Sequence, residues 1–294
     1  MIRWSYAFID RPFVRFDAGC AFWAAVTGTR LSARRGPAGE FATLLPAGGD
    51  AYLKVQGVGD AGGAHLDLAV DDLAVEARRA GELGATVVFR EPDLVVLRSP
   101  GGQLFCLVPW AGEVSQPTPV VAPDGTASRL DQVCVDIAPG KYDAEVVFWR
   151  ALTGWEFHRG GPPEFNGPPE FNGPPEFNGP PEFNGPPEFN GPPEFNGPPE
   201  FNGPPEFNGP PEFNLLLPPA PGPVRILLQR LGEDRPNSAH LDLACADIEA
   251  TRSWHEGHGA SVVGPGSSWT VMRDPAGGIY CLTGRDPYTG DSPQ

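Results

Sequence analysis

The sequence Gly-Ala-His-Leu-Asp-Leu-Ala occupies residues 63–69, and Ser-Ala-His-Leu-Asp-Leu-Ala occupies residues 238–244. Apolar and polar residues alternate in both segments, which is typical of a β-strand with one buried face. A second match lies 41 residues after each histidine, at Cys106 and Cys281, where the chain reads Phe-Cys-Leu and Tyr-Cys-Leu. The equal spacing indicates a tandem duplication.

A Phe-Trp pair followed by Thr-Gly occurs upstream in both halves, at residues 22–28 and 148–154. The tryptophan precedes the strand histidine by 42 residues in the first half and by 91 in the second. The hexapeptide GPPEFN, repeated nine times over residues 161–214, accounts for all but one residue of this difference, because eight extra copies contribute 48 residues. The array is therefore an expansion inside the second copy.

The prolines of the array exclude a helix or a central strand, since each lacks an amide donor and has a fixed φ. We expect an exposed insertion loop, and a partner-binding role for its repeated phenylalanines is the less favoured alternative.

Composition excludes several classes of protein. The net charge is −16, and without eight copies of the hexapeptide it is −8, so a nucleic-acid partner is not expected. The sequence contains no apolar run long enough to span a bilayer, and its first residues lack the basic-then-apolar layout of a signal peptide, so export is not expected. Five cysteines without a CxxC spacing favour reduced thiols. We therefore expect a cytoplasmic protein with no membrane partner, either a monomer or a homodimer.

The order of predicted elements divides the chain into two similar domains. The polar, turn-rich residues 113–127 are predicted to link domain 1 (residues 1–112) to domain 2 (residues 128–286), and residues 287–294 form a flexible tail. Each half is predicted to contain two strand–helix–strand–strand units. The predicted strands of the first module in each half cover residues 4–9, 41–45 and 52–56, and residues 130–137, 213–217 and 224–229.

Together with an Asp-Pro-x-Gly turn before the last strand, these motifs resemble the vicinal oxygen chelate superfamily, which includes glyoxalase I, the extradiol dioxygenases and the bleomycin-resistance proteins. The resemblance covers both halves outside the linker and the array. It implies an α+β fold of two tandem glyoxalase-like domains. Each domain would contain paired βαβββ modules that form a curved, partly open mixed sheet with helices on the convex side.

The resemblance also implies positions for a candidate pocket and for up to four metal ligands in each domain. The family's ligands come from the first, fourth, fifth and last strands. The positions carried over to this sequence are Gln56, His65 and Cys106 in the first half, and Gln132, Gln229, His240 and Cys281 in the second. At the first-strand position the first half offers Ser5 or Tyr6, because the alignment there is ambiguous by one residue.

Neither set of positions includes a carboxylate, which Mn²⁺, Fe²⁺ and Mg²⁺ prefer. We therefore expect no confident cofactor. If a divalent metal binds, it is expected at Gln132, Gln229, His240 and Cys281. The alternative role of each cysteine is a small buried core residue, and that of each strand histidine is a structural hydrogen-bonding group. His255 and His258 lack the spacing of a zinc motif and are expected to lie in solvent at the end of a helix.

Three functions remain open. The first is a small-molecule binding protein without the family's usual metal site, similar to the bleomycin-resistance proteins. The second is a divalent-metal-dependent lyase or dioxygenase of glyoxalase type. The third is a catalytically silent, duplicated scaffold. The sequence does not identify the ligand or any catalytic residue.

Overall fold

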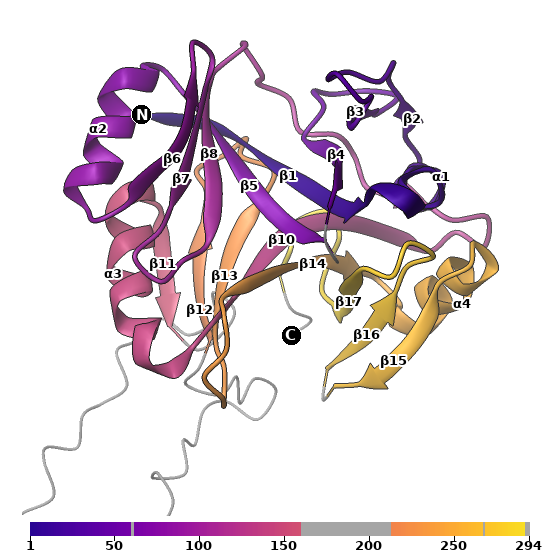
Figure 1. Cartoon of the computed structure of the whole chain (residues 1–294). Coiled ribbons are helices and arrows are strands. Elements are labelled where there is room, and N and C mark those ends of the chain that lie inside the picture. Colours follow the sequence, from indigo (N-terminus) through magenta and orange to yellow (C-terminus); the bar gives the residue numbers. More distant parts are fainter. Residues whose placement is uncertain (60–61, 160–212, 267, 292–294) are drawn as a thin grey trace, which may run out of the picture.

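The computed structural model describes residues 1–59, 62–159, 213–266 and 268–291, and these residues form two mixed β-sheets, one from each half of the chain (Figure 1). In spatial order, sheet A consists of β2 (Arg30–Leu31), β3 (Phe41–Leu45), β4 (Leu53–Val58), β1 (Ile2–Pro12), β5 (Gly63–Val70), β8 (Leu104–Pro109), β7 (Leu94–Arg98) and β6 (Thr86–Glu91). Sheet B consists of β11 (Glu156–Arg159), β12 (Phe213–Leu217), β13 (Arg225–Arg230), β10 (Ala127–Ile137), β14 (Ser238–Cys245), β17 (Ile279–Gly284), β16 (Trp269–Arg273) and β15 (Ser261–Pro265).

Each module contributes one helix, and a short linker strand joins sheet B. The helices are α1 (Phe16–Val26), α2 (Leu73–Glu82), α3 (Tyr142–Thr153) and α4 (Ile248–Gly257). Short 3₁₀ turns precede α1 and α3, at Phe13–Arg15 and Pro139–Lys141. Strand β9 (Val120–Val121) lies within the predicted linker and pairs with the start of β10. Within the described residues, no helix has the length and apolar character needed to cross a membrane.

The strand pairing confirms two βαβββ modules in each half. The first strands of the two modules, β1 and β5, are antiparallel neighbours, and each also pairs in parallel with the last strand of its own module, β4 or β8. Sheet B repeats this arrangement with β10, β14, β13 and β17. The predicted strands at residues 41–45 and 213–217 coincide with β3 and β12. The short strands β2, β9 and β11 were not predicted from the sequence, because such short runs carry no clear period.

Local signals in the sequence determine where the helices begin and end. Asp72 and Asp247 cap α2 and α4, each accepting a hydrogen bond from the backbone N–H three residues later. After α3 the chain turns at Gly154, whose φ of +63° is a left-handed conformation that favours glycine.

The two halves exchange helix contacts. Helix α1 packs on the second half, where Trp23 contacts Tyr280 of β17 with ring centroids 5.1 Å apart. Helix α3 packs on the first half in the same way, with 5.1 Å between the ring centroids of Trp149 and Phe105 of β8. The Phe-Trp pairs are therefore core residues, as the sequence predicted, and one hydrophobic core extends through both halves.

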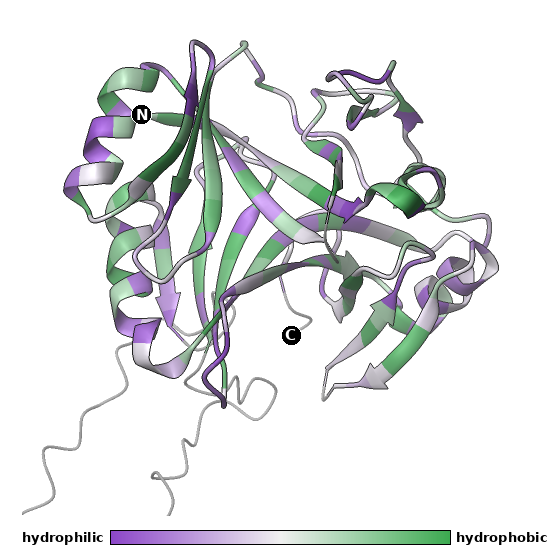
Figure 2. Ribbon diagram, viewed as in Figure 1, coloured by the Kyte–Doolittle hydropathy of each residue, from purple (hydrophilic) through white to green (hydrophobic). Residues whose placement is uncertain are grey.

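Hydrophobic residues cover much of the strands, and polar residues lie on the helix surfaces, in loops and within some strands (Figure 2). His255 is a polar helix residue that the sequence wrongly predicted to lie in solvent. It is fully buried at the contact between α4 and α1, where its Nδ1 lies 2.9 Å from the Tyr280 hydroxyl. His258, one turn later, is exposed as predicted.

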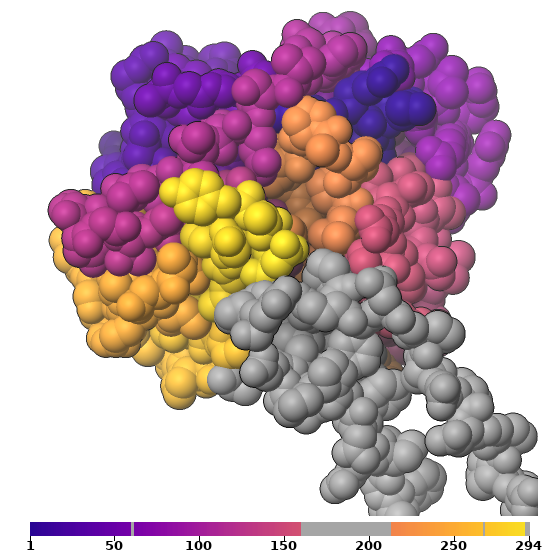
Figure 3. Space-filling model, turned by 180° about the vertical axis from the view of Figure 1, so that it is seen from behind, coloured from indigo at the N-terminus to yellow at the C-terminus, as the bar shows by residue number. Residues whose placement is uncertain are grey.

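The C-terminal segment also packs on the second sheet. Figure 3 shows it in yellow between the orange and magenta segments. Arg225 donates hydrogen bonds to the carbonyls of Thr289 and Gly290, and Arg129 donates one to the carbonyl of Tyr288. Tyr288, Thr289 and Gly290 belong to the segment that was predicted as a flexible tail. Most of the hexapeptide array lies outside the described residues, and only its last two residues, Phe213 and Asn214, are seen, at the start of β12.

Candidate functional site

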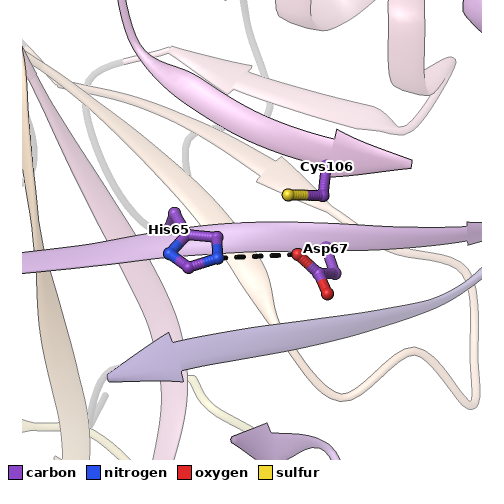
Figure 4. A group of neighbouring side chains, drawn as sticks. All are labelled: His65, Asp67 and Cys106. Atoms are coloured by element: carbon purple, nitrogen blue, oxygen red, sulfur yellow. Dashed lines mark ion pairs between the residues drawn. The ribbon is translucent and has the colours of Figure 1, made fainter. Parts of the chain in front are cut away.

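Three side chains of the first half meet on one face of sheet A. His65 and Asp67 lie two residues apart on β5, so both point to the same side, and Cys106 lies beside Asp67 on β8. Figure 4 shows the three side chains together. Their nitrogen, oxygen and sulfur atoms lie within 4.8 Å of one another. The helices pack on the opposite face, where Phe105 contacts Trp149.

His65 lies between two carboxylates. Its Nδ1 is 2.7 Å from Asp10 Oδ2 on β1, and its Nε2 is 3.6 Å from Asp67 Oδ1. The Phe8 ring stacks on the imidazole with 4.4 Å between centroids. Burial alone would lower the pKa of His65, but the charge and hydrogen bond of Asp10 outweigh it and raise the pKa.

The first half also holds a lysine inside the cluster. The Lys54 ammonium lies 3.9 Å from Asp67 Oδ2 and 3.6 Å from the ring centroid of Tyr6. Burial lowers the pKa of Lys54, while Asp67 opposes this change. The Tyr6 hydroxyl donates a hydrogen bond to Glu113 of the linker. The Lys54 ammonium therefore already faces the Asp67 carboxylate in this half.

The second half repeats the cluster on sheet B. His240 and Asp242 lie on β14, and Cys281 lies beside Asp242 on β17. The Nδ1 of His240 is 3.2 Å from Asp136 Oδ2, and its Nε2 is 3.4 Å from Asp242 Oδ1. Burial alone would lower the pKa of His240. The neighbouring Cys134 and Asp242 raise it, together with the close contacts of the two ring nitrogens with Asp136 and Asp242, and the resulting pKa is well above the usual histidine value.

The second cluster differs from the first in its surroundings. Gln132 Nε2 donates to Asp242 Oδ2 at 2.5 Å, and the Cys134 thiol lies 3.6 Å from the Gln229 side-chain oxygen. Leu227 occupies the position of Lys54. Each of them pairs with the residue of β10 or β1 that lies opposite the strand histidine. This half therefore has a leucine where the first half has a lysine, and an amide (Gln132) and a thiol (Cys134) where the first half has Tyr6 and Phe8.

None of the positions carried over from the family holds a carboxylate, but carboxylates from other positions reach both clusters. Asp67 and Asp242 are part of the clusters, and Asp10 and Asp136 bond to the histidines. The motif His-Leu-Asp-Leu itself carried the signal, because residues two apart on a strand share a face. The resemblance implies carboxylate ligands on the fourth and last strands, whereas these aspartates lie on the first and fifth.

The structure brings together most of the residues selected from the sequence. His65 and Cys106 share one cluster, and Gln132, Gln229, His240 and Cys281 share the other. Gln56 lies beside Asp10 in the register of β4 and β1. The ambiguous first-strand position is Tyr6, because Tyr6 pairs with Asp67 as Gln132 pairs with Asp242. Ser5 points to the other side and donates to the Val224 carbonyl.

The two clusters differ in their fit to a divalent cation. In the first, the Lys54 ammonium near Asp67 opposes a second cation. In the second, imidazole, carboxylate and thiol are donors that zinc accepts. Asp242 Oδ1 is also buried and has no hydrogen-bond partner among the described residues. However, the pKa values of His240 and the Cys281 thiol are both raised, so a metal would have to displace protons from them.

The paired βαβββ modules and the inward-facing strand histidines define the class of vicinal oxygen chelate proteins. The model of the glyoxalase-like domain matches residues 7–108 and 132–283, and the chain belongs to this family. The two matches fall on sheets A and B. A comparison with curated protein sequences found no match.

Solved structures of enzymes share this fold at low sequence identity. The Mn(II)-bound glyoxalase from Novosphingobium aromaticivorans is 14% identical with a TM-score of 0.56, covering 99% of this chain and 83% of that one. The 2,2',3-trihydroxybiphenyl 1,2-dioxygenase from Sphingomonas wittichii is 14% identical with a TM-score of 0.55, covering 99% and 93%. A catechol 2,3-dioxygenase is 11% identical with a TM-score of 0.53, covering 98% and 88%. At these identities the similarity shows the fold alone.

Proposed function

We propose that this protein binds a small hydroxylated molecule at the His240 cluster, without requiring a metal. The observation that carries the proposal is that Asp242 Oδ1 is buried without a hydrogen-bond partner in the described part of the chain, as Asp67 Oδ1 is in the first half, but here with no lysine beside the carboxylate. It lies 3.4 Å from His240 Nε2, and the His240 side chain is 18% exposed. A buried acceptor next to a solvent-reached imidazole favours a ligand that donates a hydrogen bond.

The electrostatics support binding without a metal. With its pKa raised, His240 carries a proton at neutral pH and is the cation between Asp136 and Asp242. A divalent ion held by these two carboxylates would place its positive charge at the same position as the imidazole. A neutral hydroxylated ligand can bind there without displacing a proton from the imidazole.

The second half is the better site because its cluster has no lysine. Lys54 and the bond from Tyr6 to Glu113 occupy the corresponding region of the first half. Two structural neighbours are named as enzymes of hydroxylated aromatic compounds, a trihydroxybiphenyl and catechol. We therefore select catechol as the probe.

Calorimetry with catechol, under anaerobic conditions in the presence of EDTA, tests the proposal. We expect saturable binding of one catechol per chain. Asp242→Asn should weaken it at least about tenfold, since each lost 1.4 kcal/mol is a factor of ten in affinity. The matched variant Asp67→Asn, at the same position of the first half, should change it little. Absence of binding, or equal effects of the two variants, contradicts the proposal.

A metal-dependent activity is the second candidate, because the ligand-type atoms of His240, Asp242 and Cys281 lie within 4.8 Å. A zinc-type ion held by these side chains would supply a Lewis acid for a substrate oxygen. Elemental analysis of protein purified without chelators tests this function. About one metal per chain, lost in His240→Ala but kept in His65→Ala, would replace the metal-free proposal.

A further inference from the structure

A cavity of about 170 Å³ lies away from both histidine clusters, between the two halves. Its wall comes from the end of α1, the loop between β3 and β4, the linker, and the start of β10. Val26, Leu44 and Leu53 give it an apolar side, and Ser128 and Arg129 give it a polar one. None of the residues of the candidate sites lines it.

The duplication provides a control for this cavity, because the same region exists once more in the molecule. There, the end of α3 meets the start of β1, and only about 10 Å³ remains open. Trp155 follows the Thr-Gly that ends α3, whereas Thr29 follows the Thr-Gly that ends α1. Trp4 likewise lines the closed copy where Leu130 lines the open one. Two large side chains fill one copy, and two smaller ones leave the other open.

The arginine in the open copy lacks the partner of its counterpart. In the first half, Arg3 Nε donates to Asp71 Oδ1 at 2.7 Å. Asp71 directly follows β5, which pairs with the start of β1, and Ala246 directly follows β14, which pairs with the start of β10. Ala246 therefore corresponds to Asp71. Arg129 Nε is buried and has no hydrogen-bond partner among the described residues. The neighbouring hydroxyl of Ser128 is buried and unpartnered there as well.

The local charge is also unbalanced. Asp131 is the acidic group nearest to Arg129 in sequence, and both of its oxygens accept hydrogen bonds from Arg285 at 2.7 Å. Arg225 lies 3.6 Å from the same carboxylate. Two arginines therefore share one aspartate, whereas Arg129 donates to the Tyr288 carbonyl and has no ion pair among the described residues.

We propose that this cavity binds a small monocarboxylate with an apolar body about as large as one six-membered ring. The guanidinium of Arg129 and the hydroxyl of Ser128 donate hydrogen bonds to the carboxylate, as arginine does in paired carboxylate recognition. The apolar body packs on Val26, Leu44 and Leu53. The size is appropriate, since an apolar cavity of about 150 Å³ holds benzene.

Calorimetry of the full-length protein with benzoate tests the proposal, and benzamide is the neutral control of equal shape. We expect one benzoate per chain with a dissociation constant below about 1 mM, and binding of benzamide at least about tenfold weaker. Asp242→Asn, which acts on the histidine cluster, should leave benzoate binding unchanged. This result would separate the cavity from the site of the proposed function.

Two variants that imitate the closed copy identify the cavity as the binding site. Thr29→Trp fills it as Trp155 fills the other copy, and should abolish benzoate binding. Ala246→Asp gives Arg129 a carboxylate partner like the one that Asp71 gives Arg3. It should weaken benzoate binding at least about tenfold, or about 1.4 kcal/mol, while the protein stays folded. Arg3→Met is the matched control and should bind like the unmodified protein.

Three results would overturn the proposal. The first is the absence of saturable binding at about 10 mM benzoate, tenfold above the expected upper limit. The second is binding that neither Thr29→Trp nor Ala246→Asp alters. The third is a crystal structure grown with benzoate in which only ordered water contacts Arg129 and Ser128.

Discussion

Trp23 of α1 donates its indole N–H to Asp274 Oδ2 at 2.9 Å, although 251 positions separate the two residues. Asp274 is buried and also accepts hydrogen bonds from the Arg11 guanidinium and from the backbone N–H groups of Ala276 and Gly278. One carboxylate of the second half thus holds a helix and a strand of the first. We infer that the two halves fold as one cooperative unit.

Trp23→Phe should lower the free energy of unfolding by at least about 1–3 kcal/mol, because it removes a hydrogen bond to a buried carboxylate. The smaller ring also leaves part of the core empty. Urea denaturation followed by circular dichroism measures the change. Trp110→Phe is the control, since Trp110 is partly exposed and should cost less than about 0.5 kcal/mol. Two separate transitions in the unmodified protein would contradict a single cooperative unit.

Stability should depend on pH through His240. Its pKa in the folded protein is raised above the unfolded value of about 6.5. The protonated imidazole therefore contributes its full stabilisation below about pH 6.5, and this contribution is lost as the pH rises through the folded pKa. His240→Gln should accordingly destabilise the protein most near pH 6, and less as the pH rises.

Denaturation of both proteins at several pH values from about 6 to 10 measures this difference, in a range that begins near the unfolded pKa. His258→Gln, at an exposed histidine, should show no such trend. A difference between His240→Gln and the unmodified protein that stays constant over the range would refute the prediction.

Lys54→Leu reproduces in the first half the leucine that the second half has at position 227. It should destabilise the protein by about 1–2 kcal/mol, because the ammonium contacts the Tyr6 ring and lies near the Asp67 carboxylate. A double-mutant cycle with Asp67→Asn should give a coupling free energy of about 0.5–3 kcal/mol. Additive effects would show that the two charges do not interact.

Shortening the array to one GPPEFN should leave the protein folded, with an unchanged or slightly higher melting temperature. Its two ends are neighbours, since Arg159 of β11 pairs with Asn214 of β12. Closing a shorter loop between fixed ends costs less entropy, and the difference is about 1–2 kcal/mol. Differential scanning calorimetry of both forms measures it. A large fall in melting temperature would mean that the repeats contribute to the folded core.

The sequence alone determined the duplication and the fold. The equal spacing from His65 to Cys106 and from His240 to Cys281 indicates two copies of one topology, and strand alternation relates each histidine to the face of its own strand. The same alternation also places Asp67 and Asp242 on the faces of His65 and His240, although neither aspartate stands at a ligand position of the family. These properties follow from local periodicity, which a sequence displays directly.

Only the tertiary structure decided which groups meet across the molecule. The bond between Trp23 and Asp274, the burial of His255, and the position of Lys54 beside Asp67 each depend on how separate strands and helices pack. The cavity beside Arg129 likewise exists because Thr29 lies where the other copy has a tryptophan. Such contacts join residues far apart in the chain, and their geometry is set by packing of the whole core, so no local pattern specifies them.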